Sequence, residues 1–314
     1  MTDDEVTRDR ALIDATNELL DWGIQDDSIN DAPLPSRVFH YTDAGGLIGM
    51  LTSQTIWATD FRFLNDQSEL RYTFDLAHRV LQEEYAEPRA SGVEAAFLIA
   101  AGGERPAVYE ATPYYLACFT EAENSLSQWR AYAGSQGYCL EFPGDIGTVA
   151  PAELAHGQNP GISLLRVEYD LEVQRAYIKG LIDRLLERIC PSRHLTSVPP
   201  EVAIRTFMPF YWAQLERVSY RFKHPDFAVE QEWRLVAWGD VHREEYRTGE
   251  FGVTPYTYFR PASSGAFSSP LPIRSVRYGP TQTPTATAYA LRRLLDRSGY
   301  ADCVGLGSDT PVRL

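Results

Sequence analysis

The stretch YYLACFTEAENSLSQWRAYAGSQGYCLEF, residues 114–142, decides the fold class. Its two ends, residues 114–121 and 137–142, predict strands, and residues 125–133 between them predict a short helix. No part of the stretch is a long hydrophobic run of the kind that a buried parallel sheet shows. The pattern therefore predicts a compact α+β core and not a repeated series of βαβ units.

Upstream of this stretch, residues 38–41 predict a short strand, and Thr42 can cap a helix that follows it. The apolar face of that helix consists of Leu47, Ile48 and Leu51. Residues 56–63, IWATDFRF, predict extended chain. Another helix begins after them, because Asp66 and Glu69 have the spacing of a capping box.

Downstream, two long helical patterns cover residues 170–190 and about 199–222, and together they predict a helical insertion at about 170–222. Residues 230–238, EQEWRLVAW, form the strongest later strand pattern. We therefore expect an α+β fold with a mixed or split β core, flanked by helices and interrupted by the helical insertion.

The first residues predict a separate segment. Apolar positions within residues 7–24 recur with helical spacing, and residues 25–36 are polar and contain proline. Residues 1–36 are thus expected to be an N-terminal helix with its linker, and residues 37–314 to be a single α+β domain.

The composition is that of a globular protein, with 44% hydrophobic and 23% charged residues among 314. A net charge of −14 argues against a general nucleic-acid binder. No apolar run is long enough to span a membrane, and the N-terminus lacks the apolar region of a secretory signal. The four cysteines are scattered and form no CxxC pair, which predicts a cytoplasmic protein with free thiols and no metal site.

Common cofactor and nucleophile motifs, namely GxGxxG, the Walker loop, HExxH and GxSxG, are absent. Four polar groups remain at the ends of predicted elements, where pockets usually form. They are His40 with Tyr41 and Thr42; Asn65; Gln128, Trp129 and Arg130; and Glu230, Glu232 and Arg234. We expect Asn65, Trp129 and Arg130 to converge near His40.

Strand alternation refines two of these groups. It places His40 on the strand face opposite Phe39 and Tyr41, and it places Glu230, Glu232 and Arg234 together on one face of the late strand. Purely structural roles are the alternative for these residues. His40 would bond to the backbone, Trp129 would belong to the core, and the acidic residues with Arg234 would form an ion pair on a solvated edge strand. Arg130 is either an ion-pair partner or, as a cation in an acidic protein, a contact for phosphate.

Several sequence blocks, in this order, resemble the bacterial domain-of-unknown-function family 2971. The blocks are FHYT at 39–42, IWATDFRFLNDQSE at 56–69, the strands and helix within 114–142, KHPDFAVEQEWRLV at 223–236, and IRSVRYGP at 273–280. The resemblance covers roughly residues 37–314.

A second resemblance is to the ADP-ribosyltransferase fold, through the early His-Tyr-Thr strand and the late Glu-x-Glu-Trp strand. It implies that His40 holds a ribose hydroxyl of NAD and that Glu232 bonds the 2′-hydroxyl of the nicotinamide ribose. The aromatic side chain that stacks on nicotinamide is one of Trp57, Phe61, Tyr72 and Trp129.

These resemblances predict an NAD-consuming ADP-ribosyltransferase-like enzyme, or an NAD glycohydrolase, with a role as a bacterial toxin or anti-phage defence effector. His40 and Glu232 would be catalytic, and Glu230 would orient an acceptor, either protein or nucleic acid. The residues expected to hold the NAD substrate are Tyr41, Thr42, Trp57, Asn65, Tyr72, Gln128, Trp129, Arg130 and Arg234. The alternative is a non-catalytic nucleotide-sensing or protein-interaction module, and a metal-free nuclease using His40 and Arg130 ranks below both.

Overall fold

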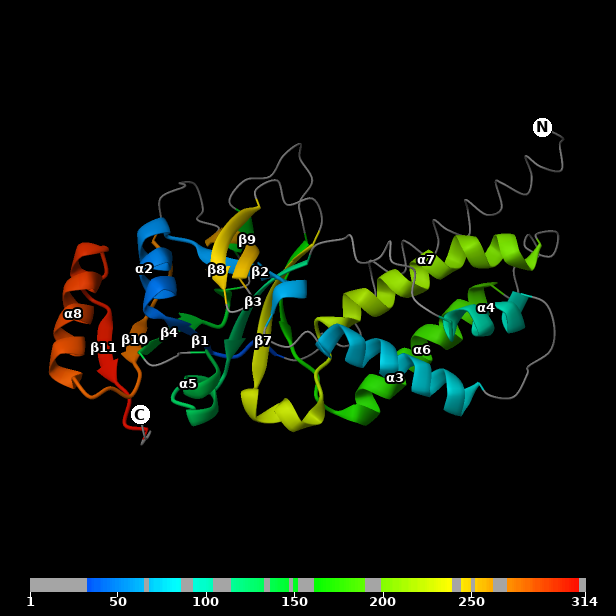
Figure 1. The fold of residues 1–314 in the computed structure, drawn as a ribbon, viewed down its shortest axis with the longest axis horizontal. Helices are drawn as coiled ribbons and strands as arrows, with labels where there is room; N and C mark the ends of the chain where they lie inside the picture. Colours follow the sequence, from blue (N-terminus) through cyan, green and yellow to red (C-terminus); the bar gives the residue numbers. More distant parts are fainter. Residues whose placement is uncertain are drawn as a thin grey trace. The chain divides into compact units, whose positions relative to one another are not determined.

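The computed structural model describes most of the chain between residues 33 and 310. The described ranges are 33–64, 68–85, 93–103, 114–132, 136–146, 149–151, 161–189, 199–238, 244–249, 252–261 and 270–310. They divide into two compact units (Figure 1). The sheet unit takes its residues from 32–65, 113–167 and 226–314, and the helical unit takes its described residues from 66–112 and 168–225. The predicted N-terminal helix at 7–24 lies outside the described residues.

The sheet unit is built on one mixed sheet, in which the described residues form eleven strands. They are β1 (Arg37–Asp43), β2 (Ile56–Asp60), β3 (Tyr114–Thr120), β4 (Gly137–Pro143), β5 (Val149–Pro151), β6 (Gly161–Arg166), β7 (Glu232–Trp238), β8 (Glu245–Gly249), β9 (Gly252–Pro261), β10 (Ser275–Tyr278) and β11 (Val304–Gly307). The main path runs β11-β10-β4-β1-β3-β2-β9-β5, with β7 also pairing β3, β6 pairing β7, and β8 pairing β9. Only β10 and β11 pair in parallel among these strands, so the α+β prediction is confirmed.

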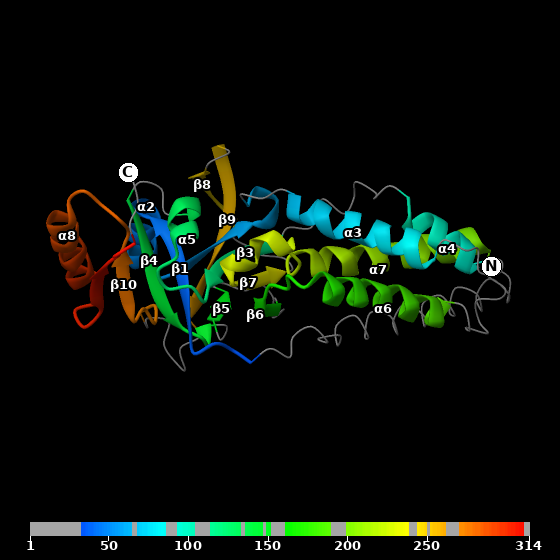
Figure 2. The ribbon, with the colours of Figure 1, turned by 90° about the horizontal axis from the view of Figure 1, so that it is seen from below.

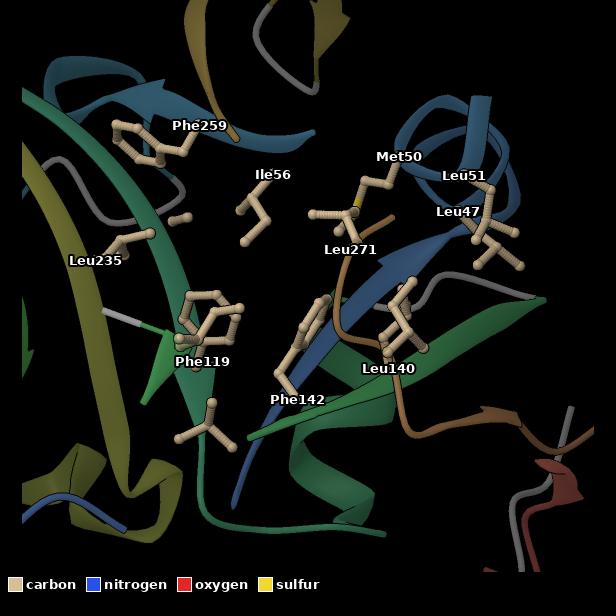
Figure 3. Close-up of a cluster of buried hydrophobic side chains, with 14 of the residues drawn as sticks. Leu47, Met50, Leu51, Ile56, Phe119, Leu140, Phe142, Leu235, Phe259 and Leu271 are labelled. Atoms are coloured by element: carbon tan, nitrogen blue, oxygen red, sulfur yellow. The ribbon is translucent and has the colours of Figure 1, made fainter. Parts of the chain in front are cut away.

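One face of the sheet carries the main core of this unit. Alternate residues of the strands point to it, including Val38, Phe119 and Leu235. Helix α2 (Ala44–Ser53) contributes Leu47, Met50 and Leu51 to the same cluster (Figure 3). Helix α8 (Pro284–Arg297) contributes Leu291 and Leu295. We call this side the core face. Ile48, which the sequence pattern places in the core, is instead 50% exposed, because α2 turns that position away from the sheet.

The opposite face carries α5 (Leu126–Tyr132). Here a smaller cluster joins Phe39, Tyr41, Trp129 and Cys139. We call this side the α5 face. The predicted alternation in β1 is confirmed, since Val38 lies in the core-face cluster while its neighbours Phe39 and Tyr41 lie in the α5-face cluster.

Strands β1 and β2 share one edge of β3 and separate there. β1 pairs with β3 only where Phe39 faces Thr120, at one end of β3. β2 pairs with β3 where Thr59 and Asp60 face Leu116 and Tyr115, at the other end. The middle of β3 is therefore flanked by β7 on one side and by diverging strands on the other.

The helical unit consists, in its described part, of α3 (Ser68–Glu84), α4 (Val93–Ala101), α6 (Leu171–Ile189) and α7 (Pro200–Ser219). Figure 2 shows α3, α6 and α7 running alongside one another, and the three make mutual contacts. Their apolar faces form one core that includes Leu76, Ile182 and Tyr211. The predicted helices at 170–190 and 199–222 correspond to α6 and α7, and the unit also includes α3 and α4 from an earlier part of the chain. No helix within the described ranges has the length and apolar character needed to cross a membrane.

Candidate functional site

The separation of β1 and β2 brings together six side chains from four strands, which we call the split site. They are His40 and Thr42 on β1, Trp57 and Thr59 on β2, Arg247 on β8, and Tyr256 on β9. Contacts place Arg247 beside Trp57, Thr59 and Tyr256, and its charge acts on His40. Thr42 is included because it shares a face of β1 with His40. All six belong to the sheet unit.

His40 occupies the gap beside the middle of β3. Its Nδ1 lies 2.8 Å from the carbonyl oxygen of Cys118. A carbonyl can only accept a hydrogen bond, so Nδ1 carries the proton and, in the neutral ring, Nε2 is left as an acceptor. Burial lowers the pKa of His40 from its ordinary value of 6.5; the Cys118 hydrogen bond partly opposes this effect, and the Arg247 charge adds to it. At neutral pH the side chain is therefore an uncharged acceptor suited to a hydroxyl donor.

Arg247 is the half-buried cation of the split site. One terminal nitrogen donates to Thr59 Oγ1 at 2.7 Å. Its Nε is buried and has no hydrogen-bond partner among the residues that the structure describes. Burial lowers the pKa of the guanidinium, and the charge of Asp43 acts in the opposite direction. Because a buried guanidinium is normally paired with an anion, this residue has donor capacity that the described residues do not use.

Two aromatic rings, packed against each other, lie beside that guanidinium. Its central carbon lies 5.9 Å from the ring centres of both Trp57 and Tyr256, a distance at which a cation interacts with aromatic faces. The two rings are themselves 5.1 Å apart. Trp57 also packs against α2 at Gly49, where an added Cβ would come within 2.3 Å of the indole. Gly49 therefore allows the close approach that fixes Trp57.

The predicted residues Tyr41, Gln128 and Trp129 lie away from the split site. Tyr41 and Trp129 pack edge to face on the α5 face, with ring centres 4.8 Å apart, whereas His40 alternates to the other face of β1. The Tyr41 hydroxyl donates to Ala122 O, and Trp129 Nε1 donates to Asn124 Oδ1. Gln128 is buried and Arg130 is exposed. The expected convergence of Trp129 and Arg130 with His40 is not observed, because strand alternation turns His40 away from the face that α5 covers.

Glu232 and Arg234 form a closed pair at the start of β7. Arg234 Nε and Nη2 donate to the two carboxylate oxygens of Glu232 at 2.8 and 2.9 Å. Both side chains are buried, with exposed fractions of 5% for Glu232 and 1% for Arg234. Arg234 is paired with Cys118 of β3 across the sheet. Its neighbour Leu235 belongs to the core-face cluster, so the Arg234 side chain points to the other face. The pair thus lies on the side of the sheet opposite the core face and His40.

Glu230 does not share that face, contrary to the strand prediction. It ends a short 3-10 helix, η4 (Pro225–Glu230), and its carbonyl accepts a hydrogen bond from Thr120 Oγ1. Gln231 then adopts φ of 45°, and β7 begins only at Glu232. The left-handed residue interrupts the extended chain, so the two-residue alternation that would align Glu230 with Glu232 does not apply.

Two further predicted residues fall elsewhere. Tyr72 belongs to the helical unit, where its hydroxyl donates to Gln174 Oε1 at 2.6 Å and His224 packs against its ring. Asn65 lies outside the described residues. Of the predicted set, Trp57 therefore lies beside Arg247, and His40 lies near enough to Arg247 for its charge to act on the imidazole.

Arg247, Thr59 and Tyr256 were not predicted as site residues. The segment EYRTG, residues 245–249, gives only a weak strand pattern, although the glycines at 249 and 252 mark the turn of the β8–β9 hairpin. The proximity of Arg247 to Trp57 depends on β2 pairing with β9, and no local pattern indicates that pairing.

Among the described residues, no three His, Cys, Asp or Glu side chains gather closely enough to hold a metal ion. No curated protein and no solved structure matches the chain. Residues 128–235, from α5 to the middle of β7, match the model of the family described as "Protein of unknown function (DUF2971)". This match supports the resemblance to that family which the sequence blocks indicate.

Proposed function

We propose that the chain binds a nucleotide-type ligand, NAD in the first instance, at the split site and consumes it as an ADP-ribosyltransferase-like enzyme or NAD glycohydrolase. The observation that carries the binding proposal is Arg247, a half-buried guanidinium that lies beside two aromatic rings and whose Nε donor has no partner among the described residues. A guanidinium can bind phosphate through several donors at once. The reaction itself rests on the resemblance to the ADP-ribosyltransferase fold.

The other groups of the split site suit the remaining parts of such a ligand. Nε2 of neutral His40 can accept a hydrogen bond from a ribose hydroxyl, as the resemblance implies. Trp57 and Tyr256 offer half-buried aromatic surface for a planar base. Thr42 adds a hydroxyl on the same face of β1 as His40.

Catalysis would break the bond between the nicotinamide nitrogen and the ribose carbon. Nicotinamide leaves with the electron pair, and the oxygen of water or of an acceptor bonds to the ribose and loses its proton. Positive charge develops on the ribose during this step, and a nearby carboxylate stabilises it. Glu232 is the proposed carboxylate, and Glu230 is proposed to orient the acceptor.

One observation favours the alternative, a nucleotide-binding module without catalysis. The charge of Glu232 is already matched by Arg234 through two hydrogen bonds, and the pair lies on the side of the sheet opposite His40. A carboxylate whose two oxygens both accept from one guanidinium is poorly suited to stabilise positive charge on a ligand. Binding of NAD without release of nicotinamide would support this second function.

The binding test compares Arg247→Met with Arg293→Met, an exposed arginine on α8 that packs against Tyr289. We expect Arg247→Met to weaken NAD binding by about tenfold to a hundredfold, as the loss of a charge-assisted hydrogen bond does, and Arg293→Met to leave it unchanged. Calorimetry with NAD and with ADP-ribose measures both. Equal affinities for the wild type and Arg247→Met would reject the split site as the binding site.

The catalytic test follows nicotinamide release. Glu232→Gln should reduce it by about 10²-fold while NAD affinity changes only a few-fold, because the charge acts in the transition state. Glu230→Gln should impair transfer to an acceptor more than hydrolysis. Unchanged turnover in Glu232→Gln would reject its catalytic assignment, and a wild type that neither binds nor consumes NAD would reject the whole proposal.

A further inference from the structure

The guanidinium of Arg247 is held by a strand other than its own. Arg247 lies on β8, which pairs only with β9 among the described strands, so its backbone lies at an edge of the sheet. Its side chain reaches β2, where Nη2 donates to Thr59 Oγ1 at 2.7 Å. Thr59 is buried and pairs with Leu116 of β3 on one side and with Tyr256 of β9 on the other. A strand fixed on both sides therefore holds the end of a side chain that starts at the edge.

The residue that holds the guanidinium carries no charge. A threonine hydroxyl accepts the hydrogen bond without cancelling the positive charge, whereas the carboxylate of Glu232 cancels the charge of Arg234. The Thr59 side chain is branched at Cβ, so few rotamers are open to it and its oxygen has a defined position. Thr59 thus fixes the position of the Arg247 guanidinium and leaves its charge available to an anion.

The terminal nitrogens of Arg247 are the donors that a ligand can reach, because Nε is buried. Nη2 is used in part by Thr59, and Nη1 is neither among the buried nitrogens nor hydrogen-bonded to a described residue. A planar guanidinium binds two phosphate oxygens through paired N–H groups, and this geometry requires a defined orientation of the plane. The bond to Thr59 and the contacts with the Trp57 and Tyr256 rings restrict that orientation.

We propose that Thr59 is a positioning residue, which orients the guanidinium of Arg247 toward the oxygens of a ligand phosphate. A long arginine side chain loses rotamer freedom when it binds a ligand, and a contact that orders it beforehand removes this cost from binding. The inference deepens the proposed function and rests on it for the identity of the ligand. The orienting role itself can be measured with an anion that has neither base nor ribose.

The test compares Thr59→Val with Thr59→Ser and measures the affinities for inorganic pyrophosphate and for NAD by calorimetry. Valine keeps the branched shape and suits a strand, but it cannot accept a hydrogen bond. We expect Thr59→Val to weaken the binding of both probes by about threefold to tenfold, the cost of ordering one long side chain. Thr59→Ser restores the hydroxyl and should recover most of this loss.

Two comparisons separate positioning from a general loss of structure. Thr55→Val removes another buried threonine hydroxyl, which is hydrogen-bonded to Ser53, and should leave both affinities unchanged. In the Arg247→Met background, Thr59→Val should cause no further loss of affinity, because the group that Thr59 orients is already absent. Urea unfolding checks that each variant is folded.

The outcomes distinguish this inference from the proposed function. If Thr59→Val binds both probes as tightly as the wild type, the role of Thr59 is overturned and the proposed function stands. An equal loss in Thr59→Ser, or a further loss in the Arg247→Met background, also overturns that role, since the hydroxyl does not then act through the guanidinium. If the wild type binds pyrophosphate but not NAD, the proposed function is rejected, and the pyrophosphate affinities of the variants still decide the role of Thr59. A wild type that binds neither probe overturns both.

Discussion

Two arginines of the same sheet unit differ in how their charge is matched. Arg234 gives two hydrogen bonds to the carboxylate of Glu232, and both side chains are buried. Arg247 is held by a threonine hydroxyl and two aromatic rings, and its Nε has no partner. The comparison separates a charge that is satisfied within the protein from a charge that still has bonding capacity. Only the second kind indicates a ligand of opposite charge.

The largest effect is expected at the closed pair. Arg234→Met leaves the Glu232 carboxylate buried beside an apolar side chain, which should lower the free energy of unfolding by about 3–5 kcal/mol. The double variant Glu232→Gln with Arg234→Met removes both charges and should recover much of the loss. Urea unfolding of the wild type, the single variant and the double variant measures this. A single variant as stable as the wild type would mean that the pair contributes nothing to stability.

Next in size is the packing of Trp57 on α2. Gly49→Ala places a methyl group within 2.3 Å of the indole, so the ring or the helix must move. We expect a loss of about 1–3 kcal/mol in the free energy of unfolding, together with weaker NAD binding. Gly180→Ala on α6 is the matched control, since a Cβ added there has no atom within 4 Å beyond its own helical backbone. Equal stability of the two alanine variants would show that Trp57 does not depend on Gly49.

A smaller effect concerns the pH dependence of stability. The pKa of His40 is lowered in the folded state by burial, so below about pH 6.5 the unfolded chain binds a proton that the folded chain does not. The contribution of His40 is fully present above pH 6.5 and is lost as the pH falls below it. His40→Gln should reduce the slope of the unfolding free energy against pH in that window. The reduction should not exceed the slope that one bound proton produces. A profile identical to that of the wild type would show that His40 titrates equally in both states.

The smallest effect on stability is expected at Arg247. Arg247→Met removes one hydrogen bond to Thr59 but also removes a desolvated charge, so these two effects oppose each other. We expect the free energy of unfolding to change by less than about 1 kcal/mol, although NAD binding is weakened. Thermal unfolding with and without NAD measures both quantities. A loss comparable to that of Arg234→Met would place Arg247 among the structural charges.

Local patterns in the sequence account for much of the fold. Apolar runs indicate β3, β4 and β7, and helical spacing indicates α6 and α7, because these signals depend on neighbouring residues alone. Alternation also places Glu232 beside Arg234 and places His40 opposite Tyr41. The misplacement of Glu230 has a conformational cause, since the left-handed backbone of Gln231 interrupts the strand period.

Less of the candidate site than of the fold could be predicted from the sequence. His40, Thr42 and Trp57 lie in sequence blocks that indicate function. Arg247 lies in a short polar strand whose position depends on the β8–β9 hairpin and on the long-range pairing of β9 with β2. The separation of β1 from β2 depends on register along β3, which is set by contacts across the whole sheet. Such long-range pairing has no signature in any single segment.

The central position of β3 also constrains when this sheet can form during synthesis on the ribosome. β3 pairs with β1 and β2, which precede it, but Tyr114 to Thr120 face Trp238 to Glu232 of β7, more than a hundred residues later. Until β7 has emerged, one edge of an apolar strand remains without its partner, a state prone to pairing with other chains. Helices α6 and α7 are synthesised during that interval. Chaperone dependence and slow, late acquisition of structure are therefore expected for nascent chains of this protein.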